Sequence, residues 1–186
     1  MDSPALTSPD ILFPAGGARL LVVDDSRTAL QVMGKRLTRM GYCTSLCDSG
    51  SEALDLLQAR RFDLVLLDMT MPGLSGIATL REIRATPVTA DLPVLMITGR
   101  TDDAAAVEAL ATGADDWVLK PFSFEVLGAR IERLLDRARA FAALRRSNEA
   151  LDARIAHRAI ELGELRSELA AVRSELLRLT ATSASA

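Results

Sequence analysis

The sequence predicts an α/β fold, a doubly wound parallel sheet whose five strands alternate with helices. Short apolar runs alternate along the chain with longer segments of helical periodicity, which is typical of βαβ units. Residues 64–67 form an unbroken apolar run, the pattern of a strand buried on both faces of a parallel sheet. Asp68 follows directly, before a loop with Pro72 and Gly73. Because ligands in such sheets bind beyond the carboxyl ends of the strands, we expect the chemistry of this protein at Asp68.

Turn and capping residues divide the chain into successive strands and helices. The expected strands are residues 20–23, 42–47, 64–67, 93–97 and 117–119. The helices are expected to begin at Ser26, Ser49, Ser75, Thr101 and Ser123, whose side chains can cap free backbone amides. Glu52 stands three residues after Ser49, the spacing of a capping box.

Length and charge argue against several classes of protein. The chain has 186 residues, of which 49% are hydrophobic, and a formal net charge of −3. This mild acidity argues against a sequence-independent nucleic-acid binder, which needs a basic surface. No apolar run approaches the roughly 20 residues of a membrane span, and residues 1–13 lack the order of a signal peptide. We therefore expect a cytoplasmic protein with no nucleic-acid or membrane partner.

Polar residues mark the carboxyl ends of four expected strands: Asp24 and Asp25 after the first, Asp68 after the third, Thr98 at the fourth and Lys120 at the fifth. In the flavodoxin-like strand order 2-1-3-4-5, the first and third strands are neighbours, so the three carboxylates converge. Their mutual repulsion would raise at least one pKa unless a cation is present. Oxygen ligands of this kind suit Mg²⁺. Lys120 and Thr98 then complete a pocket that could hold the anionic oxygens of a phosphoryl group on Asp68.

Lysine is rare in this chain, which draws attention to Lys120. Of the 22 basic residues, Lys35 and Lys120 are lysines and the others are arginines. A compact ammonium acts as a point charge toward phosphate, which a planar guanidinium does not reproduce. Taken singly, each residue of the pocket also has a structural explanation, as a helix cap, a turn residue or a surface charge. Their joint occurrence at strand ends favours the functional explanation.

Four short runs of sequence carry a resemblance to a known family. They are LVVDD at 21–25, LDMTMPG at 67–73 followed by Gly76, MITG at 96–99 and KPF at 120–122. With these runs in this order, residues 19–138 resemble the receiver (CheY-like) domain of bacterial two-component response regulators. The resemblance implies a phosphoacceptor rather than an enzyme. It takes a phosphoryl group from a histidine kinase and loses it, at most, by slow self-dephosphorylation.

The resemblance also implies roles for single residues. These are phosphoacceptor for Asp68, phosphoryl contacts for Thr98 and Lys120, and Mg²⁺ ligation by Asp24, Asp25, Asp68 and the backbone carbonyl of Met69. The peptide bond before Pro121 is cis in the family.

Three further positions follow from the same resemblance. Trp117 stands where the family usually has a tyrosine or phenylalanine that acts with Thr98 as a switch. Because indole is bulkier than phenol, we expect the inward swing of this side chain to be altered. Thr70 and Arg100 lie two residues past Asp68 and Thr98, at positions that tune the access of hydrolytic water in the family. We expect both to affect dephosphorylation.

Beyond this region, residues step by four and three along a heptad seam. The seam consists of Leu144, Asn148, Leu151, Ile155, Arg158, Leu162, Leu165, Leu169, Val172, Leu176 and Leu179, of which nine are Leu, Ile or Val. Such a repeat favours a coiled coil over an isolated helix. Asn148 falls at an a position, where a buried amide often fixes the alignment of a parallel dimer. Glu161 and Glu168 fall at g, at the spacing that pairs with e-position Arg166 and Arg173 of a parallel partner.

The sequence therefore predicts four segments. They are a flexible arm (1–17), a receiver domain (18–139), a coiled-coil dimerisation helix (140–180) and a disordered tail (181–186). The expected function is a response regulator of a two-component phosphorelay that signals through a parallel homodimer to a downstream protein.

Two alternative functions remain open at this point. The first is an aspartate-nucleophile phosphatase of the haloacid dehalogenase type, which also places an Asp after a buried strand. That mechanism needs a second acid two residues on, where this chain has Thr70. The second is a coiled-coil scaffold that works without phosphorylation, against which the acidic positions and Lys120 argue.

Overall fold

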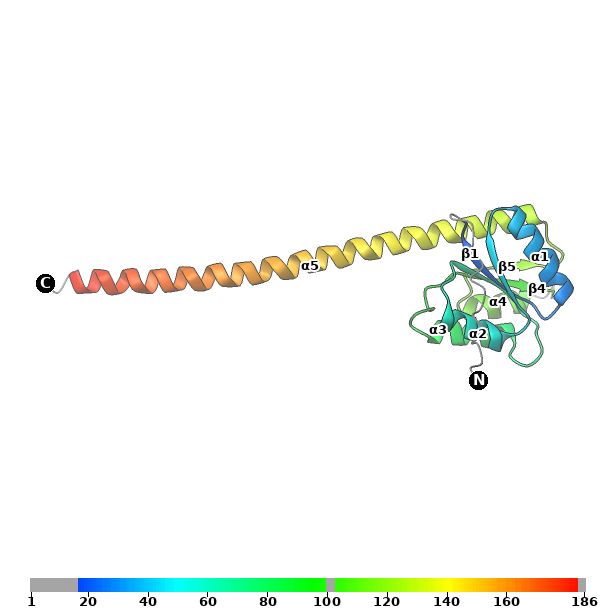
Figure 1. Ribbon diagram of the computed structural model, residues 1–186. Helices are drawn as coiled ribbons and strands as arrows, with labels where there is room; N and C mark the ends of the chain where they lie inside the picture. Colours follow the sequence, from blue (N-terminus) through cyan, green and yellow to red (C-terminus); the bar gives the residue numbers. More distant parts are fainter. Residues whose placement is uncertain (1–16, 100–102, 184–186) are drawn as a thin grey trace, which may run out of the picture. The chain divides into compact units, whose positions relative to one another are not determined.

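The computed structural model describes residues 17–99 and 103–183, in which strands and helices alternate (Figure 1). The strands are β1 (Arg19–Val23), β2 (Cys43–Cys47), β3 (Leu64–Asp68), β4 (Val94–Thr98) and β5 (Asp116–Leu119). The helices are α1 (Arg27–Arg39), α2 (Gly50–Ala59), α3 (Gly76–Ala85), α4 (Asp103–Ala111) and α5 (Phe124–Ser183). The expected elements are found in the expected order, and strand ends differ from the expected ones by single residues.

The strands form one parallel sheet in the order β2-β1-β3-β4-β5, which confirms the flavodoxin-like fold. Val23 of β1 is in register with Leu67 of β3, so these two strands end side by side. Thr98 of β4 is likewise in register with Leu119 of β5. The carboxyl ends of the four strands that carry the candidate site residues therefore meet at one edge of the sheet.

Alternate residues of the strands face two separate apolar clusters. Leu21, Leu67 and Met96 belong to the cluster covered by α2, α3 and α4. Leu20 and Leu66 belong to the cluster covered by α1 and the first turns of α5. Both faces of the central strands are thus buried, which explains why β1 and β3 are continuous apolar runs rather than alternating ones.

Serine side chains cap the helices largely as expected. The hydroxyl oxygens of Ser26, Ser49, Ser75 and Ser123 each accept a hydrogen bond from the amide three residues on. The capping box differs in one detail, because the Glu52 carboxylate accepts from the amide of Asp48 rather than from that of Ser49. Thr101, the expected cap of α4, lies outside the described residues.

Both cysteines of the chain, Cys43 and Cys47, are buried free thiols in β2. Burial raises the pKa of the Cys47 thiol to about 12, and the nearby Glu52 carboxylate adds to this effect. Because the thiolate is the reactive form of cysteine, Cys47 is chemically inert at neutral pH.

Arg84, near the end of α3, holds three neighbouring segments together. Its guanidinium donates to the backbone carbonyls of Ala90, Leu92 and Gly113. It also donates to Asp115 Oδ2 at 2.8 Å, and the same oxygen accepts from the amide of Val94 at 2.9 Å. This network ties the end of α3 to the start of β4 and to the segment before β5.

The described residues form two compact units that divide between Ala138 and Arg139. In the second unit the seam side chains face solvent, with exposed fractions that range from 50% for Leu151 to 69% for Leu169. The side chains of Val172, Leu176 and Leu179 lie outside those described. Helix α5 reaches Ser183 and thus takes in the first residues of the expected tail. None of the described helices is long and apolar enough to cross a membrane.

We predict that Arg84→Met lowers the free energy of unfolding by about 2–4 kcal/mol, because it removes a charged donor from partly buried acceptors. Urea denaturation of the full chain measures this. Arg81→Met is the matched control on the same helix, since the Arg81 side chain is 64% exposed and its guanidinium lies 3.9 Å from Glu108 Oε1. We expect a change below about 0.5 kcal/mol there. Equal losses for the two variants would contradict a special role for Arg84.

Candidate functional site

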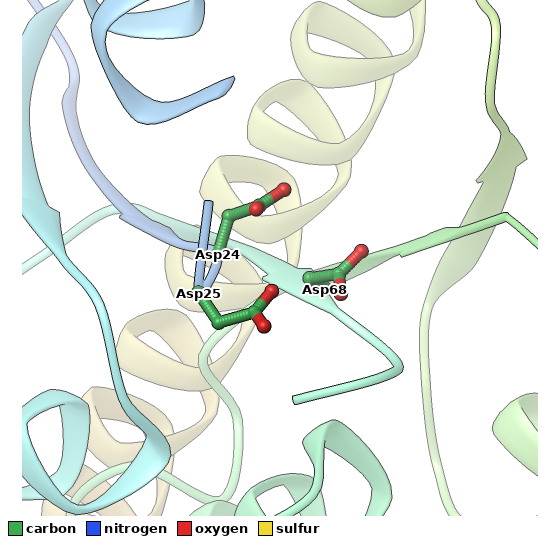
Figure 2. Close-up of side chains that lie close together, drawn as sticks. All are labelled: Asp24, Asp25 and Asp68. Atoms are coloured by element: carbon green, nitrogen blue, oxygen red, sulfur yellow. The ribbon is translucent and has the colours of Figure 1, made fainter. Parts of the chain in front are cut away.

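Three carboxylates converge where β1 and β3 end (Figure 2). Asp24 and Asp25 follow β1, and Asp68 is the last residue of β3. One oxygen from each of the three side chains lies within 4.8 Å of the others. Asp24 and Asp68 are 1% and 5% exposed, whereas Asp25 is open to solvent. The convergence expected from the sequence is therefore present, and it opens to solvent on the side of Asp25.

The ammonium of Lys120 bridges the two buried acids. Its Nζ donates hydrogen bonds of 2.7 Å to Asp24 Oδ2 and 2.7 Å to Asp68 Oδ1. Lys120 follows β5, and its backbone amide donates to the carbonyl of Thr98 at 2.7 Å. The peptide bond between Lys120 and Pro121 is cis. The lysine thus reaches Asp68 from two strands away and Asp24 from three, as its place at the end of the fifth expected strand predicted.

Burial and pairing act in opposite directions on the charges of this site. Burial raises the pKa of Asp68 above its usual value, the nearby Asp24 adds to this, and Lys120 only partly offsets it. For Lys120, burial alone would lower the pKa, but its hydrogen bonds to Asp24 and Asp68 raise it overall. The ammonium therefore stays charged at neutral pH, while burial makes the charged form of the Asp68 carboxyl less favourable than it would be in water.

Backbone amides hold the two buried acids in place. The amide of Ser26 donates to Asp24 Oδ1 at 2.9 Å, and the amide of Thr70 donates to Asp68 Oδ2 at 3.2 Å. In both cases an aspartate accepts from the amide two residues on, the pattern of an Asx turn. These two bonds were not among the features predicted from the sequence, although an Asp at the start of a loop is a recognised signal for them.

The loop after Asp68 packs tightly against the first turn of α3. The amide of Gly76 donates to the carbonyl of Met69 at 3.1 Å, and a Cβ at Gly76 would overlap the backbone oxygen of Asp68. Real Cβ atoms do not approach a carbonyl this closely, so a side chain here would displace the end of β3. The Met69 carbonyl, a predicted metal ligand, thus lies in a loop that is anchored by the hydrogen bonds of the Thr70 and Gly76 amides.

Of the remaining predicted residues, three lie in the described part of the chain and one does not. Thr98 is a buried last residue of β4, beside the position in register with Asp68, and Thr70 is exposed next to the acid. Trp117 lies in β5 and packs on the cluster covered by α2, α3 and α4. Arg100 lies outside the described residues. The roles predicted for these four positions stay predictions.

The donor set suits a hard divalent cation. Asp24, Asp25 and Asp68 bring three negative charges against the single positive charge of Lys120, and the Met69 carbonyl offers a further oxygen. Mg²⁺ binds oxygen ligands, usually through one or two carboxylates, and keeps several waters. The exposed Asp25 side leaves access for water. The residues present therefore fit Mg²⁺ in charge, ligand type and access.

We predict that Asp68→Asn raises the stability of the metal-free protein at pH 7. The substitution removes a carboxyl group whose pKa is raised by burial, and whose charged form is therefore destabilising in the folded state. A raised carboxyl pKa means that the folded state binds the proton more tightly than the unfolded state. Wild-type stability therefore falls as the pH rises from the ordinary aspartate pKa to the raised pKa of folded Asp68. The stability advantage of the variant should therefore shrink on acidification toward pH 4. Thermal unfolding in EDTA measures it, with exposed Asp55→Asn as control. A variant that is less stable than wild type at pH 7 would contradict the argument.

Comparison with known proteins is consistent with this geometry. A family model described as the response regulator receiver domain matches residues 20–132. The response regulator MprA of Mycolicibacterium vanbaalenii is 43% identical over 119 residues, which are 64% of this chain and 51% of that protein. This chain thus spans about half the length of the curated relatives it matches.

Two solved structures extend the comparison. The chemotaxis protein CheY4 of Vibrio cholerae is 33% identical, with a TM-score of 0.61 over 64% of this chain and 99% of that one. The signal receiver domain of a histidine kinase from Syntrophus aciditrophicus is also 33% identical, with a TM-score of 0.61 over 64% of this chain and 91% of that one. With the family model covering more than half of its residues, the chain belongs to the response regulator receiver domain family.

Proposed function

We propose that this protein is a phosphoacceptor of a two-component phosphorelay, in which Asp68 takes a phosphoryl group from a histidine kinase with Mg²⁺. The proposal rests above all on one observation, the meeting of Asp24, Asp25 and Asp68 within 4.8 Å, with Lys120 bonded to two of them. Membership of the receiver family supports the kinase as the donor. The chain is proposed to be cytoplasmic and to act without nucleic acid or membrane.

The chemistry is a transfer from a kinase histidine to a carboxylate. A carboxylate oxygen of Asp68 attacks the phosphorus, a new P–O bond forms, and the P–N bond to the histidine breaks with its electron pair left on nitrogen. Asp24, Asp25, Asp68 and the Met69 carbonyl would hold Mg²⁺, which when bound would supply positive charge for the phosphoryl oxygens. Lys120 supplies a second positive charge, and its raised pKa keeps it protonated for this purpose.

Other residues of the site act after transfer. The Thr98 hydroxyl contacts the phosphoryl group and, with Trp117, changes position as the switch of the domain. Thr70 and Arg100 tune the approach of the water that hydrolyses the acyl phosphate, so turnover is slow self-dephosphorylation rather than enzymatic. A haloacid dehalogenase-type phosphatase is not favoured, because the residue two past Asp68 is Thr70, whose amide bonds Asp68.

The output is a parallel coiled-coil homodimer that signals to a protein partner. We assign residues 18–139 to the receiver and 140–180 to the coil. The exposed seam leucines of the second unit support this, since such a row is buried only against another helix. Glu161 and Glu168 at g, facing Arg166 and Arg173 at e of the partner, favour the parallel arrangement.

Labelling with acetyl phosphate and Mg²⁺ tests the phosphoacceptor. We expect one phosphoryl group per wild-type chain by intact mass spectrometry, and none on Asp68→Asn. Asp55→Asn, an exposed carboxylate on α2, is the matched control and should label like wild type. Lys120→Ala should label at least about tenfold more slowly, since it removes a charge-assisted contact worth about 1.5–3 kcal/mol. Equal labelling of wild type and Asp68→Asn would contradict the proposal.

A leucine in the seam tests the coil. Arg158→Leu replaces a charge at a d position by an apolar side chain, whose burial is worth about 1.5–3 kcal/mol. We therefore expect the dimer dissociation constant from analytical ultracentrifugation to fall at least about tenfold. Arg146→Leu, at an outer f position, is the control and should leave it unchanged. Equal effects of the two variants would contradict the seam, as would undiminished dimerisation of a chain that ends at Arg139.

A further inference from the structure

The predicted seam carries a single charged residue, Arg158 at a d position. Arg154 precedes it by one turn at the neighbouring g position, and both side chains are exposed. Among the described residues, neither guanidinium has a hydrogen bond or an ion pair. The nearest acid along this face, Glu161, lies 3.7 Å from His157 Nδ1. The two arginines therefore bring positive charge to the seam that the described part of the chain does not neutralise.

The acids nearest in sequence, Asp152 and Glu161, fall at e and g positions of the neighbouring layers rather than in the Arg158 layer. Residues 153–160 contain Arg154, His157 and Arg158 but no Asp or Glu. Arginines four residues apart on one helix face repel each other. In a parallel pair in register, Arg158 also faces its own copy, and the flanking e position holds Ala159. A charge enclosed in such a layer without a partner is strongly unfavourable.

We propose that the Arg158 layer selects a partner helix with an acidic residue at the facing core position. The inference rests on the proposed coiled coil and names the chemistry of its downstream partner, an acidic amphipathic helix. The homodimer is the assembly of the isolated protein, and exchange with the acidic helix relieves the repulsion between the two Arg158 side chains. The apolar seam residues supply affinity to either assembly, whereas the charged layer discriminates between them.

In the receiver unit of the same chain, a single carboxylate oxygen binds two closely spaced arginines. Asp116 Oδ2 accepts hydrogen bonds of 2.7 Å from Arg130 and 2.8 Å from Arg133. Charge-assisted bonds of this kind are about twice as strong as neutral ones. A carboxylate at the Arg158 layer of a partner helix would likewise accept charge-assisted hydrogen bonds from Arg158 and Arg154.

Mixing two forms of the full chain tests the inference, with the acid supplied by the protein itself. Wild-type chain and Arg158→Glu chain carrying a mass tag are mixed, unfolded, refolded together and examined by native mass spectrometry. We expect mixed dimers to exceed the statistical half, with an exchange constant at least about tenfold above the statistical value, because close charge pairs couple by 1.5 kcal/mol or more. Arg146→Glu makes the same change at an outer f position and should give the statistical distribution.

Each other outcome counts against the inference. Statistical mixing of wild type with Arg158→Glu overturns it, and so does equal enrichment with Arg146→Glu. If either of these results is found and Arg158→Leu still forms a tight dimer, the proposed coiled coil is retained and the proposal of an acidic partner helix is rejected. If wild-type and Arg158→Leu chains both stay monomeric, coil and inference fall together. Labelling of Asp68 by acetyl phosphate is measured separately, so the phosphoacceptor proposal stands or falls by itself.

Discussion

The crowding of negative charge at one edge of the sheet is the constraint on which the rest of the structure depends. Parallel pairing of β1 with β3 puts Asp24 and Asp68 close together, and burial removes the water that would screen them. The folded chain compensates with the ammonium of Lys120, two backbone amides and an opening beside Asp25. The fold therefore positions the acids and supplies the groups that make their proximity tolerable.

This arrangement has a consequence for how the site accepts ligands. Lys120 already bonds one oxygen of Asp24 and one of Asp68, so a divalent ion or a phosphoryl group would meet carboxylates that are already partly hydrogen-bonded. Under the proposed function, binding would then exchange partners among fixed groups rather than assemble the site. Groups that are already oriented need little reorganisation when charge develops, which is the usual source of electrostatic stabilisation in such sites.

The sequence was sufficient to predict the sheet and the main members of the site for a physical reason. β3 is buried on both faces, so its apolar run has no competing explanation, and the polar residue at each strand end stands out against it. Strand limits were less accurate. Asp116 belongs to β5 because it pairs with Leu95 across the sheet, which its polarity does not suggest.

Other features required the three-dimensional structure. The Arg84 network depends on where Ala90, Leu92 and Gly113 come together, and no local pattern aligns these residues. The two hydrogen bonds that Lys120 donates to Asp24 and Asp68 depend on the reach of a flexible side chain from the end of β5 to the ends of β3 and β1. The seam of α5 is the opposite case, because its periodicity is plain in the sequence, whereas a single chain leaves its side chains exposed and its partner undetermined.

The burial of Cys43 and Cys47 has a practical consequence for following this protein in solution. Both thiols are withdrawn into β2, and that of Cys47 stays protonated far above neutral pH. A cysteine introduced at an exposed position such as Ser147 or Ser167 would therefore react with a maleimide dye far faster than either native thiol. Fluorescence or spin probes can therefore be attached to such a variant without first replacing Cys43 and Cys47.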